Sequence, residues 1–178
     1  MKRKIKILGI SGSLRSNSSA SAILNIVAGL VPGQVEFTIY SELAGIPAFN
    51  DSNEIPQTVE AFIKLLSDAD GVFFVIPEYA FGVPGALKNA LDWTVFSSTA
   101  FPDKPVALIT AATGGDKAQA AFLLTLKAMN SKIPEGATLL ISFIRSKLND
   151  KNEVKDSATL ESINGVINSL IDSIQNEY

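Results

Sequence analysis

The 178-residue sequence contains no cysteine and no histidine. Without cysteine, the chain cannot form disulfides, use a thiolate nucleophile or hold an iron–sulfur cluster in the usual way. Without histidine, it lacks the commonest general base and metal ligand, which excludes a Ser-His-Asp triad. If the protein is an enzyme, we therefore expect a bound cofactor to carry the chemistry while the protein supplies position and electrostatics.

Long apolar runs and a strong charge are also missing. No run approaches the roughly 20 residues that a membrane helix needs. The net charge of −3 and the pI of about 5.0 disfavour a nucleic-acid-binding surface, which needs clustered basic residues. The basic start at residues 1–4 precedes only a short apolar stretch with no cleavage pattern, so a signal peptide is disfavoured. We expect a cytoplasmic protein that binds neither nucleic acid nor membranes.

Apolar, β-rich runs alternate with helical patterns along the whole chain. This alternation indicates right-handed crossovers and a parallel sheet with helices on both faces. The length and an apolar content of 47% fit one domain over residues 1–178. We predict an α/β flavodoxin-like three-layer sandwich with a five-stranded parallel sheet of order 2-1-3-4-5. The expected strands are 4–10, 35–40, 71–76, 105–110 and 137–143, and the expected helices are 20–31, 59–66, 84–96, 117–129 and 160–174.

In a sheet of this order, ligands bind beyond the carboxyl ends of the first and third strands. The segment after the first strand, residues 11–19 (SGSLRSNSS), has five serines and one charged residue, Arg15. It leads into a helix N-terminus, where free N–H groups and the helix dipole favour an anion such as phosphate. Neither GxGxxG nor GxxxxGK[ST] is present. The alternative is a serine-rich capping loop with an incidental arginine, but its place after the first strand favours phosphate.

The segment after the third strand, residues 77–85 (PEYAFGVPG), is the second unusual stretch. Two prolines and two glycines let the backbone turn sharply, and Tyr79 and Phe81 offer apolar faces to a flat ring. The alternative is an ordinary loop whose aromatic side chains fill a gap or an interface. A weaker element is residues 110–115 (TAATGG), whose adjacent glycines permit the backbone to approach the ring or a second ligand closely. The alternative is a plain turn.

Three stretches carry a family resemblance: residues 12–19 (GSLRSNSS), 77–93 (PEYAFGVPGALKNALDW) and 104–115 (KPVALIT followed by GG). Through them, about residues 4–143 resemble the NADPH-dependent FMN reductase family, which includes quinone, chromate and azo-dye reductases. The resemblance implies FMN as cofactor and NADPH or NADH as co-substrate. It also implies a small electron acceptor, such as a quinone, free flavin, azo dye or metal oxyanion, and a homodimer or homotetramer.

The resemblance also implies roles for individual residues, with the flavin carrying the chemistry and no side chain acting as catalyst or metal ligand. The phosphate would be held by Ser13, Arg15, Ser18, Ser19 and the backbone at Ala20, to which the loop pattern adds Ser11. The isoalloxazine would be lined by Pro77, Glu78, Tyr79, Ala80, Phe81 and Gly82, with Thr110 at the ring side. The family often has Asn at positions 20 and 80 and Ser at 82. These departures keep backbone contacts and remove side-chain hydrogen bonds.

Two other functions stay open. One is a flavodoxin-like electron carrier without pyridine-nucleotide activity, although such carriers tend to be more acidic than this chain. The other is a cofactor-free binding domain, for which the changes at Ala20, Ala80 and Gly82 leave room. For assembly, the expected helix at 86–96 is apolar on more than one side, which favours packing against a second subunit. Its apolar residues are Leu87, Leu91, Trp93, Val95 and Phe96, with Phe101 close by.

Overall fold

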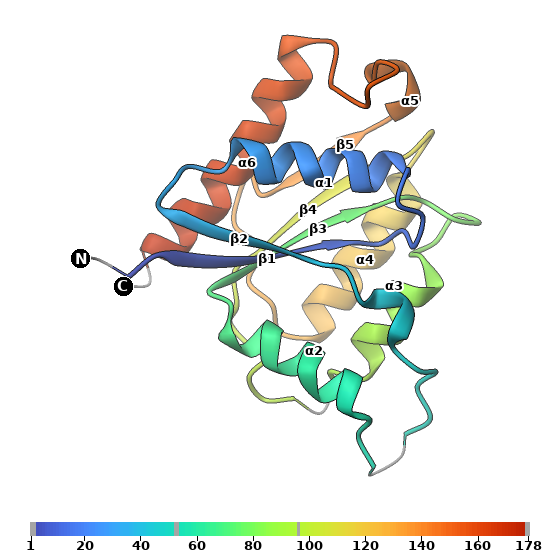
Figure 1. The fold of residues 1–178 in the computed structure, drawn as a ribbon, viewed down its shortest axis with the longest axis vertical. Helices are drawn as coiled ribbons and strands as arrows, with labels where there is room; N and C mark the ends of the chain where they lie inside the picture. Colours follow the sequence, from blue (N-terminus) through green and yellow to red (C-terminus); the bar gives the residue numbers. More distant parts are fainter. Residues whose placement is uncertain (1–2, 52–53, 96, 177–178) are drawn as a thin grey trace.

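The sheet has the predicted topology. The computed structural model describes residues 3–51, 54–95 and 97–176. Its strands pair in parallel in the order β2-β1-β3-β4-β5, so the order reverses at β1 and β3 (Figure 1). The strands are β1 (Ile5–Ser11), β2 (Val35–Tyr40), β3 (Gly71–Ile76), β4 (Val106–Ala111) and β5 (Thr138–Ile141).

Helices cover both faces of the sheet, which explains why the central strands are apolar throughout. Every residue of β3 and β4 is buried. On one face, Phe74 packs edge-on against Phe122 at a centroid distance of 5.0 Å, and Phe73 faces the other side. One face is covered by α1 (Ser19–Leu30) and α6 (Ser157–Gln175), and the other by α2 (Gln57–Asp68), α3 (Gly85–Asp92) and α4 (Asp116–Ala128) (Figure 1).

Two local expectations were wrong, and two short elements were not predicted. The helix expected at 84–96 ends at Asp92, because the amide and hydroxyl of Thr94 both donate to the Leu91 carbonyl and turn the chain. The last strand ends at Ile141, because Phe143 has a φ of 53° and begins the short helix α5 (Ile144–Lys147). A 3-10 turn, η1 (Leu43–Gly45), interrupts the long loop after β2. Both extra elements are too short for hydrophobic periodicity to reveal.

Most of the apolar residues around α3 that were expected to face a second subunit are buried within this chain. Leu87, Leu91, Trp93 and Phe101 are buried in the core of this chain, whereas Val95 is 62% exposed. Phe96 lies outside the described residues. The argument from an apolar helix was therefore wrong, and the dimer stays a prediction from the family resemblance.

Residues at the end of the 77–93 stretch form hydrogen bonds to the long loop that follows β2. The indole N–H of Trp93 and the side-chain amide of Asn89 both donate to the Pro47 carbonyl, each at 2.9 Å. The Phe49 amide in turn donates to Asn89 at 2.8 Å. Lys88 forms an ion pair with Asp92 one turn along α3, as expected of a surface lysine. Of the helices in the described part of the chain, none is long and apolar enough to cross a membrane.

Candidate functional site

The two loops that the sequence singled out lie side by side at the carboxyl end of the sheet. Ser11 is in register with Val75 across β1 and β3, and the Gly12 amide donates to the Val75 carbonyl at 2.8 Å. Beyond the strands, the Ser13 and Tyr79 hydroxyls form a hydrogen bond at 3.3 Å. The predicted meeting of the loops at the point where the strand order reverses is confirmed.

Gly12 allows this close approach. A Cβ atom at this position would lie 3.1 Å from Ile76 Cγ2 and 3.2 Å from Pro84 Cγ, which is tighter than ordinary van der Waals contact. Ile76 ends β3, and Pro84 precedes α3. A side chain at position 12 would therefore push apart the two segments that form the site.

The serine loop, residues 11–19, is held in shape by a network of hydroxyl groups. Ser18 caps α1 by accepting a hydrogen bond from the Ser21 amide at 3.0 Å, and its hydroxyl donates to Ser21 Oγ at 2.8 Å. Ser21 Oγ also donates to the Arg15 carbonyl and forms a hydrogen bond with Ser11 Oγ, each at 3.2 Å. The hydroxyls of Ser11 and Ser18 are thus engaged within the protein. Their expected contact with a phosphate stays a prediction.

Ser21 is the residue that the sequence reasoning missed. Its hydroxyl joins both ends of the serine loop, yet it lies beyond the motif that drew attention. Its place three residues after a serine N-cap was the available signal, because the capping side chain is bound by the amide at that position.

Donors for an anion remain at the start of α1. Within the described ranges, the amides of Ser19 and Ala20 have no hydrogen-bond acceptor, and the first turn of α1 carries no acidic residue. The Arg15 side chain is exposed and forms no ion pair with any described residue. The Ala20 side chain is buried, so only its backbone faces this site. One guanidinium and two free amides at a helix N-terminus suit a phosphate group.

The aromatic turn, residues 79–82, is a two-residue hairpin. Tyr79 and Gly82 exchange both backbone hydrogen bonds, at 3.1 and 2.9 Å. Ala80 and Phe81 both have positive φ angles, 48° and 59°, as in a type I′ turn. We expected the glycines to make this turn, but Gly82 and Gly85 are not in the left-handed region. Two residues with side chains therefore adopt a conformation that normally favours Asn and Gly, which stores strain at the site.

The aromatic turn exposes its rings to solvent, and the residue before it is bound to α4. Phe81 is 78% exposed and Tyr79 is 44% exposed, while Pro77 and Gly82 are half-buried. Glu78 Oε2 accepts a hydrogen bond from the Ala118 amide at 3.1 Å, near the start of α4. The Glu78 side chain thus anchors the turn to α4, so a contact with the ring would come from its backbone.

Charges beside this anchor influence one another. A hydrogen bond between Lys117 and Asp116 raises the pKa of Lys117 and lowers that of Asp116. The negative charge of Glu78 raises the pKa of Lys117 further. The ammonium of Lys117 and the carboxylate of Asp116 are both stabilised as ions at the rim of the candidate site.

Thr110 is fully buried at the end of β4, and its Oγ1 has no hydrogen-bond partner in the described part of the chain. Its expected place at the ring side stays a prediction. Gly115 has a φ of 107°, and a Cβ there would lie 2.7 Å from Leu140 Cδ1 and 3.0 Å from Thr110 Cγ2. This glycine permits close packing of the protein against itself, which differs from the expected approach to a ligand.

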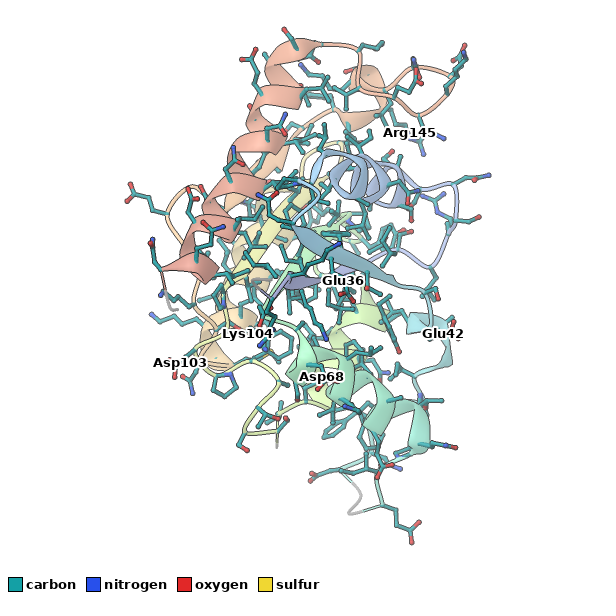
Figure 2. All side chains as sticks on the ribbon, turned by 60° about the vertical axis from the view of Figure 1, so that its left-hand side comes forward. Glu36, Glu42, Asp68, Asp103, Lys104 and Arg145 are labelled. Atoms are coloured by element: carbon teal, nitrogen blue, oxygen red, sulfur yellow. The ribbon has the colours of Figure 1, made fainter. Side chains whose placement is uncertain are left out.

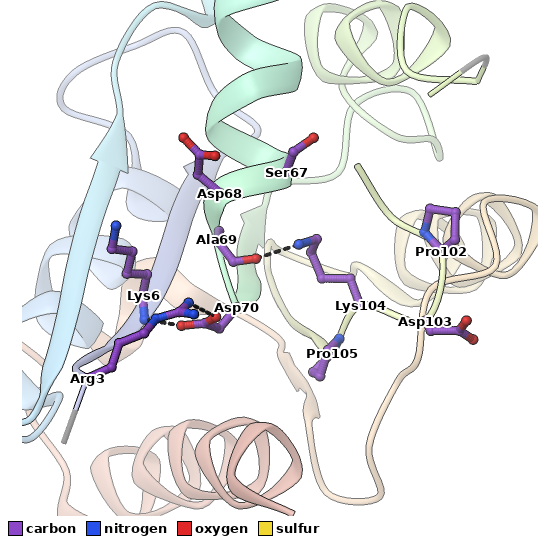
Figure 3. Close-up of a pocket in the computed structure, with 10 residues that line it drawn as sticks. All are labelled: Arg3, Lys6, Ser67, Asp68, Ala69, Asp70, Pro102, Asp103, Lys104 and Pro105. Atoms are coloured by element: carbon purple, nitrogen blue, oxygen red, sulfur yellow. Dashed lines mark hydrogen bonds and ion pairs between the residues drawn. The ribbon is translucent and has the colours of Figure 1, made fainter. Parts of the chain in front are cut away.

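A cavity of about 780 Å³ lies at the opposite end of the strands from the candidate site, near the starts of β1, β3 and β4 (Figure 3). Asp68, Asp103 and Lys104 gather at that end of the molecule, far from Arg145 (Figure 2). Charged side chains that line this cavity have partners within the protein: Asp70 pairs with Arg3 and accepts a hydrogen bond from the Lys6 backbone amide at 2.8 Å, and Lys104 donates to the Ala69 backbone carbonyl. Burial lowers the pKa of Lys104, and the charges of Asp70 and Asp68 oppose this shift.

We expect Phe81→Gly to stabilise the folded chain. Glycine adopts the left-handed conformation without a steric penalty, and the exposed ring loses little packing. After the greater flexibility of glycine in the unfolded chain is subtracted, the gain should be about 0.5–1 kcal/mol, or roughly 1–4 °C in Tm. The matched control is Val95→Gly, at an exposed residue without positive φ, which should lower Tm in thermal unfolding followed by circular dichroism. A drop in Tm for Phe81→Gly would contradict the assignment of strain.

The chain is similar to proteins of known activity. Residues 5–145 match the family model described as NADPH-dependent FMN reductase. An NAD(P)H-dependent FMN reductase from Pseudomonas aeruginosa is 40% identical over 64% of this chain, and the matched segment spans only 63% of that relative. A quinone reductase from Escherichia coli is 29% identical, with 98% of each chain covered.

Solved structures support the fold. The flavoenzyme NAD(P)H:(acceptor) oxidoreductase FerB from Paracoccus denitrificans superposes with a TM-score of 0.78 at 23% identity, covering 97% of this chain and 98% of that chain. A likeness at this identity supports the architecture alone, and the family model extends across all five strands and the loops between them. The chain therefore belongs to the NADPH-dependent FMN reductase family.

Proposed function

We propose that this chain binds one FMN and uses it to pass electrons from NADPH or NADH to a small acceptor. The observation that carries the proposal is the contact between the serine loop and the aromatic turn, which combines free anion donors with exposed aromatic faces. The acceptor would be a quinone, free flavin, azo dye or metal oxyanion. Quinone and FMN reductases among the relatives support this class of substrate.

The donor set fits FMN. Arg15 and the amides of Ser19 and Ala20 would bind the phosphate, while Tyr79 and Phe81 would lie against the ring. When bound, FMN would supply a ring that accepts a hydride from the nicotinamide and passes the electrons on. The protein would orient the reactants and exclude water, a task that needs neither histidine nor cysteine.

The test begins with titration of the purified chain with FMN, followed by flavin fluorescence. Saturable binding, and then steady NADPH or NADH oxidation with a quinone and no partner protein, are the expected results. FMN binding without nucleotide oxidation would support an electron carrier instead. A chain that binds no FMN at saturating concentration would support a cofactor-free domain and contradict the proposal.

We also propose that residues 1–178 act as one FMN-binding domain in a cytoplasmic homodimer or homotetramer. The family resemblance supports the assembly, because the apolar residues of α3 no longer argue for it. Sedimentation velocity over a range of protein concentrations tests the oligomeric state.

A further inference from the structure

We propose that Tyr79 is a positioning residue for the FMN phosphate and acts through the hydroxyl of Ser13. The inference rests on the proposed function. Ser13 Oγ lies 3.3 Å from the Tyr79 hydroxyl and also accepts a hydrogen bond from the Arg15 amide at 3.3 Å. Ser13 is buried, so its hydroxyl is enclosed between the aromatic turn and the loop that carries Arg15.

The direction of the hydrogen bond between Tyr79 and Ser13 decides what Ser13 can do. A serine hydroxyl has one proton and two lone pairs, and the Arg15 amide uses one lone pair. If Ser13 donates to Tyr79, its proton is spent within the protein. If Tyr79 donates, it fills the second lone pair, and the Ser13 proton is available to a phosphate oxygen.

A phosphate favours the second arrangement, because its ionised oxygens only accept hydrogen bonds. Tyr79 would then hold the Ser13 hydroxyl in the donating orientation and polarise it, as in other chains of hydrogen bonds. Ser13→Ala would remove the phosphate contact itself, whereas Tyr79→Phe would remove only the group that directs it.

Hydrogen bonds on both sides of Tyr79 fix the position of this residue. Its backbone bonds to Gly82 close the aromatic turn, and the neighbouring Glu78 carboxylate is bound to the Ala118 amide. The hydrogen bond therefore couples the part of the site expected to hold the phosphate to the part expected to hold the ring.

The experiment compares FMN with riboflavin, which has the same ring and no phosphate. In fluorescence titrations, Tyr79→Phe should weaken FMN binding about fivefold and leave riboflavin affinity unchanged, as expected for one lost neutral hydrogen bond. Ser13→Ala should weaken FMN binding at least as much. In the Ser13→Ala background, adding Tyr79→Phe should cause no further loss of FMN affinity. In the Ser13→Thr background, which keeps the hydroxyl, Tyr79→Phe should again weaken FMN binding.

Equal losses for FMN and riboflavin in Tyr79→Phe would overturn the inference, because they would indicate a ring contact or general loosening. An undiminished effect of Tyr79→Phe in the Ser13→Ala background would also overturn it. Thermal unfolding confirms that each variant is folded, and if Ser13→Ala does not fold, the FMN-to-riboflavin affinity ratio of Tyr79→Phe decides alone. Wild-type protein that binds no FMN would instead overturn the proposed function.

Discussion

Arg15→Ala is expected to weaken FMN binding by on the order of 10- to 100-fold, the loss expected for a charged hydrogen bond to phosphate. Arg15 is the only cation in the serine loop, and no described acidic residue is paired with it. Because the side chain is exposed, its removal should leave the core and the Tm nearly unchanged. Titration with FMN and riboflavin measures the effect, and only FMN binding should fall.

Matched variants separate this local effect from a change in net charge. Lys127→Ala removes one exposed positive charge from the last turn of α4, at the end opposite to the site, and should leave FMN affinity unchanged. Arg15→Lys keeps the charge but loses the planar, bidentate geometry, so its affinity should fall between wild type and Arg15→Ala. An affinity for FMN that is unchanged in Arg15→Ala would contradict the phosphate role. So would an equal loss for riboflavin.

The architecture was predictable because long apolar patterns determine it. The β-rich runs at 35–40 and 71–76 both appear in the structure with the predicted bounds. The run at 71–76 is buried throughout, as expected of a strand in a sheet covered on both faces, whereas the run at 35–40 alternates in burial at the edge of the sheet. The meeting of the two loops was also predictable, because adjacent parallel strands bring the loops that follow them to the same end of the sheet. The hydrogen bond between Ser13 and Tyr79 within this meeting was not predicted.

Features set by individual side chains were not predictable. Ala80 and Phe81 have positive φ angles, but this dipeptide is not the Asn-Gly that signals a type I′ turn. The sequence therefore pointed to the nearby glycines instead. The engagement of Glu78 with α4 depends on a contact between residues 40 positions apart. Thr110 lies one residue before the end of β4 and is fully buried, and its closeness to Gly115 could not be read from the sequence.

Gly12→Val should impair both folding and FMN binding. Even the first added carbon would press on Ile76 and Pro84, and the two methyl groups of valine would add to this crowding. Overpacking of this kind costs about 1–3 kcal/mol, which lowers the Tm of a chain of this size by roughly 2–12 °C. Relief requires the serine loop to move away from β3, which would lengthen the Gly12–Val75 hydrogen bond and separate Ser13 from Tyr79.

FMN affinity should therefore fall by more than about tenfold, because a site displaced even slightly loses several hydrogen bonds at once. Gly33→Val is the matched control, since Gly33 is exposed and a Cβ there would meet no atom within 4 Å. Thermal unfolding and FMN titration of both variants, with Gly12→Ala as a milder step, compare crowding at the two positions. A Gly12→Val protein with wild-type FMN affinity would show that the close approach of the two loops is not needed for binding, and the proposed site would then lack its physical basis.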